Sequence, residues 1–488
     1  MTDLDPAELQ FHNTLTRRRE AFVPLDPSNV RVYICGPTVY DLAHIGNARP
    51  VVVFDVLFRL LRHLYGESHV TYARNITDVD DKIIARAKET GEAIDSVTAR
   101  TAAAFHQDMA ALGALEPTVE PRATQHIAEM IAMIEILIAK GHAYAAEGHV
   151  LFHTPSMSDY GRLSGHKRAE LVAGARVEVA PYKQDPTDFV LWKPSSEEQP
   201  GWDSPWGRGR PGWHIECSAM SEKHLGAVFD IHGGGQDLIF PHHENEIAQS
   251  RCAHGSGEMA RIWMHNGYVV VNGEKMSKSA GNFFTVRQLL EEGFPGEAIR
   301  LTLLSAHYRQ PLDITREKIS AAKAQLDRLY QALRRVESVA PVDKGDVSWI
   351  VAALSEDLST PEALSQLHAL ANELNNEELE SEQARLKASL VQGGALLGLL
   401  QQDPEDWFKK RYILKAEPGR LTITAGDARI GGEPEEFSES EIESLILDRN
   451  AARQERNFTE ADRIRDELEA RGIVLEDGPG GTTWKRKN

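Results

Sequence analysis

The sequence predicts an α/β catalytic domain built on a doubly wound parallel sheet, interrupted by an insertion and followed by an α-helical bundle and a small C-terminal domain. Apolar runs of strand length alternate with helical repeats early in the chain, which is the pattern of such a sheet. The alternation resumes after a stretch rich in Gly, Pro and Ser, so two halves of one sheet flank an insertion. The predicted segments are 1–126 and 207–270 (the two halves), 127–206 (the insertion), 271–318 (a lysine-containing loop region), 319–405 (the bundle) and 406–488 (the C-terminal domain).

The first half opens with an apolar strand from Val30 to Cys35, and the spacing of apolar residues over 51–64 predicts the helix that follows it. Val70–Ile76 has the character of the next strand, and another helix is expected from Asp80. Sheets of this kind bind ligands at the carboxyl ends of their strands. Polar residues that follow these strands are therefore candidates for a functional site.

The insertion is expected to open with a helix over 127–140. The second half then begins with a strand at Val228–Ile231, followed by a loop at Gly233-Gly234-Gly235. A helix is predicted over 242–251 and an apolar strand over 268–271. These elements complete the sheet.

Beyond Arg316 the apolar residues follow helical spacing alone, which favours a bundle. The tail from Glu441 onward predicts two short helices that join near Asn457. The bundle stripes are Leu326, Leu329, Leu333 and Val336 on one helix and Leu364, Leu367, Leu370 and Leu374 on another.

Composition limits the function classes. The 488 residues carry 54 Lys and Arg against 73 Asp and Glu, a formal net charge of -19, so nucleic acid can bind only to a local basic face. No stretch approaches the ~18 apolar residues of a membrane span, and we expect a soluble, cytoplasmic protein. Three scattered cysteines do not make a disulfide framework.

The first chemical motif is His44-Ile45-Gly46-Asn47, in the loop where a helix should begin. Helix N-termini bind phosphate, and a glycine lets a triphosphate approach the backbone. The imidazole and the amide can donate to oxygens whose charge grows in a transition state. An ordinary loop is the alternative interpretation.

The second motif is Lys275-Met276-Ser277-Lys278-Ser279, which precedes a helix expected to be capped by Thr285. Two ammonium groups on one loop could neutralise phosphate charge. The alternative is a solvated polar turn.

The third motif places His242 and Glu246 four residues apart, on one helical face, which suits a metal. Cys35 ends the first strand and Cys217 lies in a separate segment, so both sulfurs could converge beside that pair. Two sulfurs, a nitrogen and an oxygen suit zinc. In the alternative each cysteine is a small buried hydrophobe, and Cys252 is assigned to the core.

The first two motifs resemble the HIGH and KMSKS signatures of class I aminoacyl-tRNA synthetases, whose catalytic domain is Rossmann-type. The resemblance implies that His44, Gly46, Asn47 and Lys278 bind ATP, and that His44, Asn47, Lys275 and Lys278 assist attack of an amino-acid carboxylate on its α-phosphate, with Mg²⁺ on the ATP. Asn47 departs from the signature, which has a second histidine there; an amide still donates to phosphate but carries no charge.

The third motif resembles the cysteinyl-tRNA synthetase subfamily, in which two Cys, one His and one Glu bind zinc. The resemblance carries those roles to Cys35, Cys217, His242 and Glu246, one zinc per chain. It also places Thr77 and Asp237 near the cysteine ammonium and the adenylate, with strand-end caps as the alternative. Trp213 lies four residues before Cys217, so on a helix its ring could form a wall of the pocket, or it could be a core tryptophan. The backbone of His232 and of the three glycines after it could meet adenosine, or these glycines could form a plain turn.

Two tail segments, Arg463-Ile464-Arg465-Asp466 and Gly472-Ile473-Val474-Leu475-Glu476-Asp477, resemble the anticodon-recognising end of these enzymes, and Glu356-Asp357-Leu358-Ser359-Thr360-Pro361 in the bundle also matches the family. The resemblance over nearly the whole chain implies tRNA-binding roles for 319–405 and 406–488 and a stem contact for 271–318. Arg449, Arg453 and Arg456 are expected on one helical face, and Trp484 lies in a basic cluster, a combination that suits RNA bases. The alternative is a solvated face.

The expected partners are ATP, L-cysteine and tRNA(Cys), the chain is expected to be a monomer, and no membrane is expected. A ligase that passes cysteine to an amino sugar remains an alternative, although such relatives lack the tail. A noncatalytic zinc-dependent RNA-binding protein is a second alternative.

Overall fold

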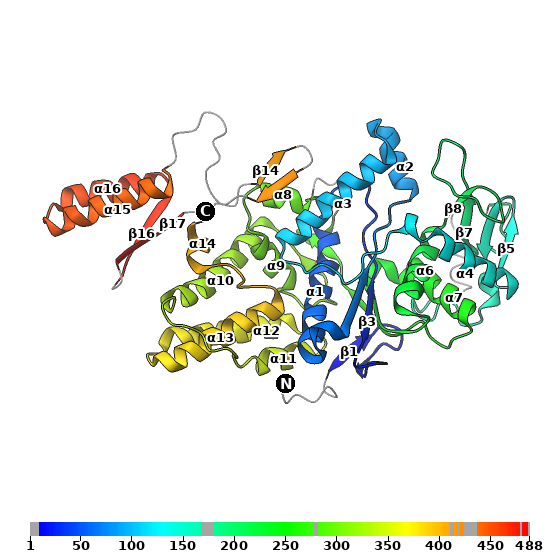
Figure 1. Cartoon of the computed structure of the whole chain (residues 1–488), viewed down its shortest axis with the longest axis horizontal. Helices are drawn as coiled ribbons and strands as arrows, with labels where there is room; N and C mark the ends of the chain where they lie inside the picture. Colours follow the sequence, from blue (N-terminus) through cyan, green and yellow to red (C-terminus); the bar gives the residue numbers. More distant parts are fainter. Residues whose placement is uncertain are drawn as a thin grey trace.

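The computed structural model describes residues 9–166, 180–276, 282–409, 414–417, 420–423, 437–478 and 481–486. A central sheet lies between the inserted domain and the helical bundle, and the C-terminal helices lie at the far end of the bundle (Figure 1). Among the described helices, none is both long and apolar enough to cross a bilayer.

The central sheet has the strand order β10-β9-β3-β4 with every neighbouring pair parallel. The strands from the first half are β3 (Val30–Ile34) and β4 (Val70–Arg74), and those from the second half are β9 (Phe229–Gly235) and β10 (Ala260–Asn266). The prediction of one parallel sheet in two halves is confirmed, but the strand predicted over 268–271 does not complete it, because β11 (Val269–Val271) belongs to a separate three-stranded sheet. Strand β10 was not predicted, because Arg261 and His265 interrupt its apolar run.

The prediction of a loop at Gly233-Gly234-Gly235 is wrong, because these glycines form the end of β9. A Cβ on Gly233 would lie 2.5 Å from Cζ of Phe54 and 2.8 Å from Cδ1 of Ile34. Glycine is therefore needed here for close packing of helix α1 (Ile45–Tyr65) on the sheet and not for a turn.

Helix α1 (Ile45–Tyr65) packs on this sheet and begins six residues earlier than its apolar spacing predicted. Its buried apolar residues belong to the same core as β3, β4 and the bundle. Because the helix starts at Ile45, the backbone of Gly46 and Asn47 belongs to its first turn, next to the sheet edge.

The insertion forms a separate antiparallel sheet in the order β5-β6-β7-β8, covered by α4 (Ile127–Ala139). Its last strand, β8, runs from Gly209 to Pro211 and extends beyond the expected end of the insertion at residue 206. The other strands are β5 (Ala143–Ala146), β6 (His149–Phe152) and β7 (Phe189–Pro194).

The bundle packs against α1 and α9 (Gly296–Leu304), and its predicted leucine stripes are buried, with Leu370 only partly so. The bundle helices are α10 (Arg316–Arg335), α11 (Ser348–Ser355), α12 (Thr360–Asn376), α13 (Glu380–Leu397) and α14 (Pro404–Lys409).

The two predicted helices of the tail are confirmed as α15 (Glu439–Gln454) and α16 (Phe458–Ala470), joined at the cap Asn457. A hairpin of β16 (Ile473–Gly478) and β17 (Gly481–Arg486) follows them and was not predicted.

The remaining elements lie beside the central sheet, in the linker segments or at the N-terminus. They are β1 (Gln10–Asn13), β2 (Arg18–Ala21), η2 (Glu67–His69), α2 (Asp81–Thr90), α3 (Ile94–Ala111), η3 (Ala123–Gln125), η4 (Thr154–Ser156), α6 (Trp213–Leu225), η5 (Gln236–Leu238), η6 (Ile239–His243), α7 (Glu244–His254), β11 (Val269–Val271), β12 (Glu274–Lys275), α8 (Val286–Glu291), α9 (Gly296–Leu304), β13 (Leu312–Asp313), β14 (Leu414–Glu417) and β15 (Arg420–Ile423).

Candidate active site and metal centre

The carboxyl edge of the central sheet gathers candidate residues from both halves of the chain. Because the strands are parallel, β3, β4 and β9 end at the same edge. Cys35 follows β3, and Thr77 follows β4, where it forms a backbone bridge with Thr38. Asp237 follows β9 and is exposed. The sheet thus brings these three predicted residues to one edge.

The first motif forms the N-terminal cap of α1. The Gly46 N–H donates to Nδ1 of His44 at 3.1 Å, and the His44 N–H donates to Oδ1 of Asn47 at 3.2 Å. This reciprocal arrangement is a capping box, which satisfies backbone groups at the helix N-terminus. Asn47 therefore has a structural role that the sequence did not reveal, and its amide NH₂ remains a donor type suited to phosphate.

The described part of the second motif lies against the first. β11 and β12 form a hairpin that leads to Met276, and a Cβ on Gly46 would lie 3.3 Å from Cε of Met276. After the loop, Thr285 forms a backbone bridge with His44 and caps α8, as predicted. Lys275 ends β12, and Lys278 lies outside the described residues together with Ser277 and Ser279.

The four predicted metal ligands converge in a buried group. Potential ligand atoms of Cys35, Cys217, His242 and Glu246 all lie within 4.8 Å of one another. The two sulfurs are 3.8 Å apart, and Oε1 of Glu246 lies 3.5 Å from Sγ of Cys35 and 3.0 Å from Nε2 of His242. The described residues therefore include a Cys/His/Glu group that could bind a metal ion.

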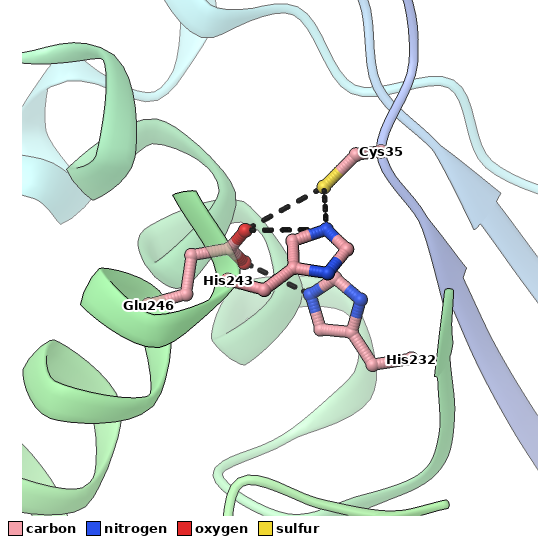
Figure 2. Close-up of side chains that lie close together, drawn as sticks. All are labelled: Cys35, His232, His243 and Glu246. Carbon is pink, nitrogen blue, oxygen red and sulfur yellow. Dashed lines mark hydrogen bonds and ion pairs between the residues drawn. The ribbon is translucent and has the colours of Figure 1, made fainter. Parts of the chain in front are cut away.

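A second possible ligand group shares Cys35 and Glu246 with the first and adds His232 and His243 (Figure 2). Nε2 of His232 lies 2.9 Å from Oε2 of Glu246, and Nε2 of His243 lies 3.3 Å from Sγ of Cys35. The His232 side chain is fully buried against Glu246, and the proposed contact of its backbone with adenosine stays a prediction. Sequence reasoning left His232 out because it lies on β9, a different element from Glu246, and left His243 out because helical spacing aligns it with apolar Ile247.

Further histidines form an outer layer around the ligands. Nδ1 of His214 lies 2.9 Å from Nδ1 of His242, so Nε2 of His242 faces Glu246. Nε2 of His265 lies 2.8 Å from Nδ1 of His243, and Nδ1 of His265 lies 2.9 Å from Oγ1 of Thr14. Outer partners of this kind orient metal-ligating imidazoles. Their sequence positions carried no spacing signal that could have identified them.

The chemistry of this cluster fits a thiophilic metal such as zinc. Burial lowers the pKa of His242 and His243 well below the usual value, and the neutral imidazole is the form that binds metal. Burial also raises the pKa of Cys35 well above its usual value, so a thiolate there needs a cation beside it. Nδ1 of His232 has no hydrogen-bond partner among the described residues. The donor set of sulfur, nitrogen and carboxylate oxygen suits zinc.

Acid should destabilise the fold through the outer layer. Burial, with a smaller contribution from His232, lowers the pKa of His265 to about 3, whereas an unfolded histidine titrates near 6.5. Between these values the unfolded state binds more protons, so stability falls as the pH drops, by up to ~1.4 kcal/mol per pH unit. Urea unfolding between pH 7 and pH 5 should show a weaker pH dependence in His265→Gln than in the wild type. Equal slopes would contradict this origin.

Trp213, a predicted substrate residue, begins α6 beside the metal ligands. Its ring stacks on His242 with centroids 4.1 Å apart and an interplanar angle of 17°, and the side chain is 37% exposed. The indole therefore lies between His242 and solvent, which fits the wall of a pocket.

Thr77 leads to a buried carboxylate that the sequence interpretation missed. Its hydroxyl donates to Oε2 of Glu216 at 2.9 Å, and Nδ2 of Asn75 lies 3.3 Å from the same hydroxyl. Burial raises the pKa of Glu216 well above its usual value. Glu216 directly precedes the predicted ligand Cys217, and this was the only feature of the sequence that could have indicated a place for Glu216 near the site.

The C-terminal domain corrects part of the predicted RNA face. Arg456 does not share a helical face with Arg449 and Arg453, because α15 ends at Gln454 and Arg456 has a φ of 61°. Arg449 is buried and forms a two-pronged ion pair with Asp477 at 2.7 and 2.9 Å, and Arg453 contacts the same carboxylate.

Trp484 is 3% exposed and packs in the core of this domain, so it does not form an open platform for bases. Hydrophobic burial explains this position, because the hairpin brings its ring onto α15 and α16. Arg453 and Arg456 are the predicted RNA contacts that are exposed.

Three matches to protein families account for most of the chain. Residues 21–324 match the class I (C) tRNA synthetase catalytic domain, residues 350–401 match the DALR domain, and residues 438–484 match the cysteinyl-tRNA ligase anticodon-binding domain. The fold and site thus define a class I aminoacyl-tRNA synthetase.

Curated relatives are similar over nearly their whole length. The cysteine–tRNA ligase of Rhodospirillum rubrum is 60% identical over 478 residues, covering 98% of this chain and 99% of the relative. That of Paramagnetospirillum magneticum is 61% identical over 486 residues, with the same coverage. The chain belongs to the cysteinyl-tRNA synthetase family.

Solved structures share the fold at low sequence identity. The LeuRS of Agrobacterium radiobacter K84, in a ternary complex with tRNA and LeuAMS, has a TM-score of 0.55 at 13% identity and covers 93% of this chain and 95% of its own. The methionyl-tRNA synthetase of Mycobacterium tuberculosis bound by methionyl-adenylate has a TM-score of 0.52 at 16% identity, covering 78% and 93%.

Proposed function

We propose that this enzyme is a cysteine–tRNA ligase that works in the cytoplasm as a monomer. It activates L-cysteine with ATP to cysteinyl-adenylate and transfers the cysteinyl group to the 3′-terminal adenosine of tRNA(Cys). The observation that carries this proposal is the buried Cys/His/Glu group at the carboxyl edge of the sheet, beside the HIGH-type helix cap. The names of the relatives and the match of residues 438–484 support the tRNA substrate.

Cys35, Cys217, His242 and Glu246 would hold one zinc ion. When bound, zinc supplies a soft Lewis acid that accepts the thiolate of cysteine and discriminates against the hard, neutral hydroxyl of serine. Shape alone separates such near-isosteres by only about 100-fold. The stacked pair of Trp213 and His242 would line this pocket, with Thr77 and Asp237 near the rest of the substrate.

The residues of the two ATP motifs act on the phosphates. A carboxylate oxygen of cysteine attacks the α-phosphate of Mg²⁺-bound ATP, and the bond to pyrophosphate breaks. His44, the backbone at Gly46, Asn47, Lys275 and Lys278 would bind the phosphates and neutralise their growing charge. A ribose hydroxyl of tRNA then attacks the adenylate carbonyl and AMP leaves. No covalent enzyme nucleophile is needed, because positioning and charge neutralisation lower the barrier.

Exchange of labelled pyrophosphate into ATP tests the first step. We expect exchange with cysteine, with or without tRNA, and little with serine. Charging of total tRNA with cysteine tests the second step. Exchange without charging would contradict the tRNA substrate and favour an amino-sugar acceptor, and a zinc-loaded protein without exchange would contradict the proposed catalysis.

A further inference from the structure

Arg49 is a fully buried arginine whose guanidinium binds only backbone carbonyls among its described partners. Nη1 donates to the carbonyls of Gly267 at 2.8 Å and Tyr268 at 2.9 Å. Nη2 donates to the carbonyls of Gln310 at 2.7 Å and His307 at 3.4 Å. The side chain is 0% exposed, and none of the described ion pairs includes it. Arg49 therefore joins α1 to two other segments of the chain.

Burying a guanidinium without a carboxylate is costly, because the charge loses its hydration. Burial lowers the pKa of Arg49 to about 10, and no neighbouring acid offsets this effect. Arg300, equally buried, is paired with Asp55. The carbonyls around Arg49 are therefore bound by the planar, fixed set of guanidinium N–H donors, which a lysine ammonium cannot reproduce.

The segments that Arg49 holds lead directly to the KMSKS-type loop. Gly267 and Tyr268 immediately precede β11, which leads through β12 to Met276. Arg49 itself lies near the N-terminus of α1, close in sequence to Gly46 and Asn47 of the first motif. One guanidinium therefore connects the helix that bears the first ATP motif to the strand that leads into the second.

The chain that leaves the loop is held on the same helix end by backbone contacts. The Ile45 N–H donates to the carbonyl of Phe284 at 3.1 Å, and the Val286 N–H donates to that of Ala43 at 3.0 Å. Before the loop, the connection is made by the Arg49 side chain, which donates from α1 to the carbonyls of Gly267 and Tyr268.

The close approach at Gly267 shows how tightly this junction is packed. A Cβ on Gly267 would lie 2.5 Å from the carbonyl oxygen of Gln310. The 307–310 loop is in turn bound to the bundle, because Asp357 accepts from the Tyr308 hydroxyl at 2.8 Å and from Nε of Arg309 at 2.9 Å. The loop thus offers Arg49 a fixed support.

We propose that Arg49 is a positioning residue for activation of the amino acid by ATP. Its buried hydrogen bonds to the carbonyls of Gly267, Tyr268 and Gln310 fix the position of the strand before the KMSKS-type loop relative to the HIGH-type end of α1. This role deepens the proposed function and rests on it for its kinetic consequence. Arg49 is fully buried, so it acts on catalysis through the strand that leads to the KMSKS-type loop.

Two conservative variants of the same helix provide the test. Arg49→Lys keeps the charge but loses the planar set of N–H donors. Arg59→Lys is the control on the same helix, because Arg59 also binds backbone carbonyls, those of Gly113 and Ala395, far along the helix from the ATP motifs. Unlike Arg49, it also pairs with a carboxylate, that of Asp55. Gly267→Ala disturbs the same junction without altering Arg49.

In pyrophosphate exchange, Arg49→Lys and Gly267→Ala should lower kcat/KM for ATP at least 10-fold and change KM for cysteine less than twofold. Arg59→Lys should change neither more than twofold. Loss of folded protein alone would lower kcat in proportion to active sites and leave both KM values unchanged. An equal effect of Arg49→Lys and Arg59→Lys, or a normal kcat/KM for ATP in Arg49→Lys, would overturn the proposal.

Amide hydrogen exchange separates this inference from the proposed function, because it needs no catalytic activity. Amides of β11 and β12 should exchange at least 10-fold faster in Arg49→Lys than in the wild type or in Arg59→Lys. Unchanged protection there would overturn the positioning role even if cysteine-dependent activity is present. If the wild type shows no ATP–pyrophosphate exchange but the amides of β11 and β12 still exchange faster in Arg49→Lys, the junction is upheld and only the proposed reaction is contradicted.

Discussion

His242→Ala should lose the metal and the selectivity for cysteine together. His242 contributes Nε2, 3.0 Å from Oε1 of Glu246, in a pocket that is buried from solvent. Loss of an outer-shell partner commonly costs 10–100-fold in metal affinity, so loss of a direct ligand should cost more than about 100-fold. Metal analysis after dialysis should show less than one zinc per chain, and the preference for cysteine over serine in exchange should fall toward the ~100-fold that shape supplies.

Cys217→Ser tests the same site from another element. Serine preserves the size of the side chain but replaces a soft sulfur by a hard hydroxyl, so zinc affinity should fall as it does in His242→Ala. Fold should be retained, because the substitution removes no buried volume of consequence, and circular dichroism checks this.

His243→Ala is the matched control, since it removes an equally buried imidazole that belongs only to the second ligand group. It should retain more zinc than His242→Ala. The reverse order, or full zinc occupancy in both His242→Ala and Cys217→Ser, would move the metal to Cys35, His232, His243 and Glu246.

Lys278→Ala should slow cysteine activation by about 10²–10³-fold, the usual cost of removing one group that stabilises transition-state charge. The lysine is expected to act on phosphate charge and not on the amino acid. KM for cysteine should therefore stay within about twofold of the wild type. Initial rates of pyrophosphate exchange at varied cysteine and ATP measure both quantities.

Lys344→Ala is a suitable control, because it removes an exposed lysine in the segment between α10 and α11. It should leave exchange unchanged. Activity of Lys278→Ala near that of Lys344→Ala would contradict the role of the second motif.

Local pattern was sufficient for much of the fold. Strands β3 and β4, helix α4 and the two tail helices lie within a few residues of their predicted positions. Their apolar periodicity depends on neighbours in sequence, and so it can be read without the tertiary structure. The glycines of β9 were misassigned, because their need for close packing against Phe54 comes from a distant helix.

The sequence by itself determined the alternation of strands and helices, the two ATP motifs and the four residues that converge as potential metal ligands. Residue type and short spacing carry the two ATP motifs and the His242 and Glu246 pair, whereas Cys35 and Cys217 were added to that pair by the family resemblance. The tertiary structure alone decided that His232 and His243 share the cluster, that Trp484 packs in a core, and that Arg49 joins α1 to the segment before the second ATP motif. These relations depend on segments brought together by packing, and no local pattern encodes distance between residues far apart in the chain.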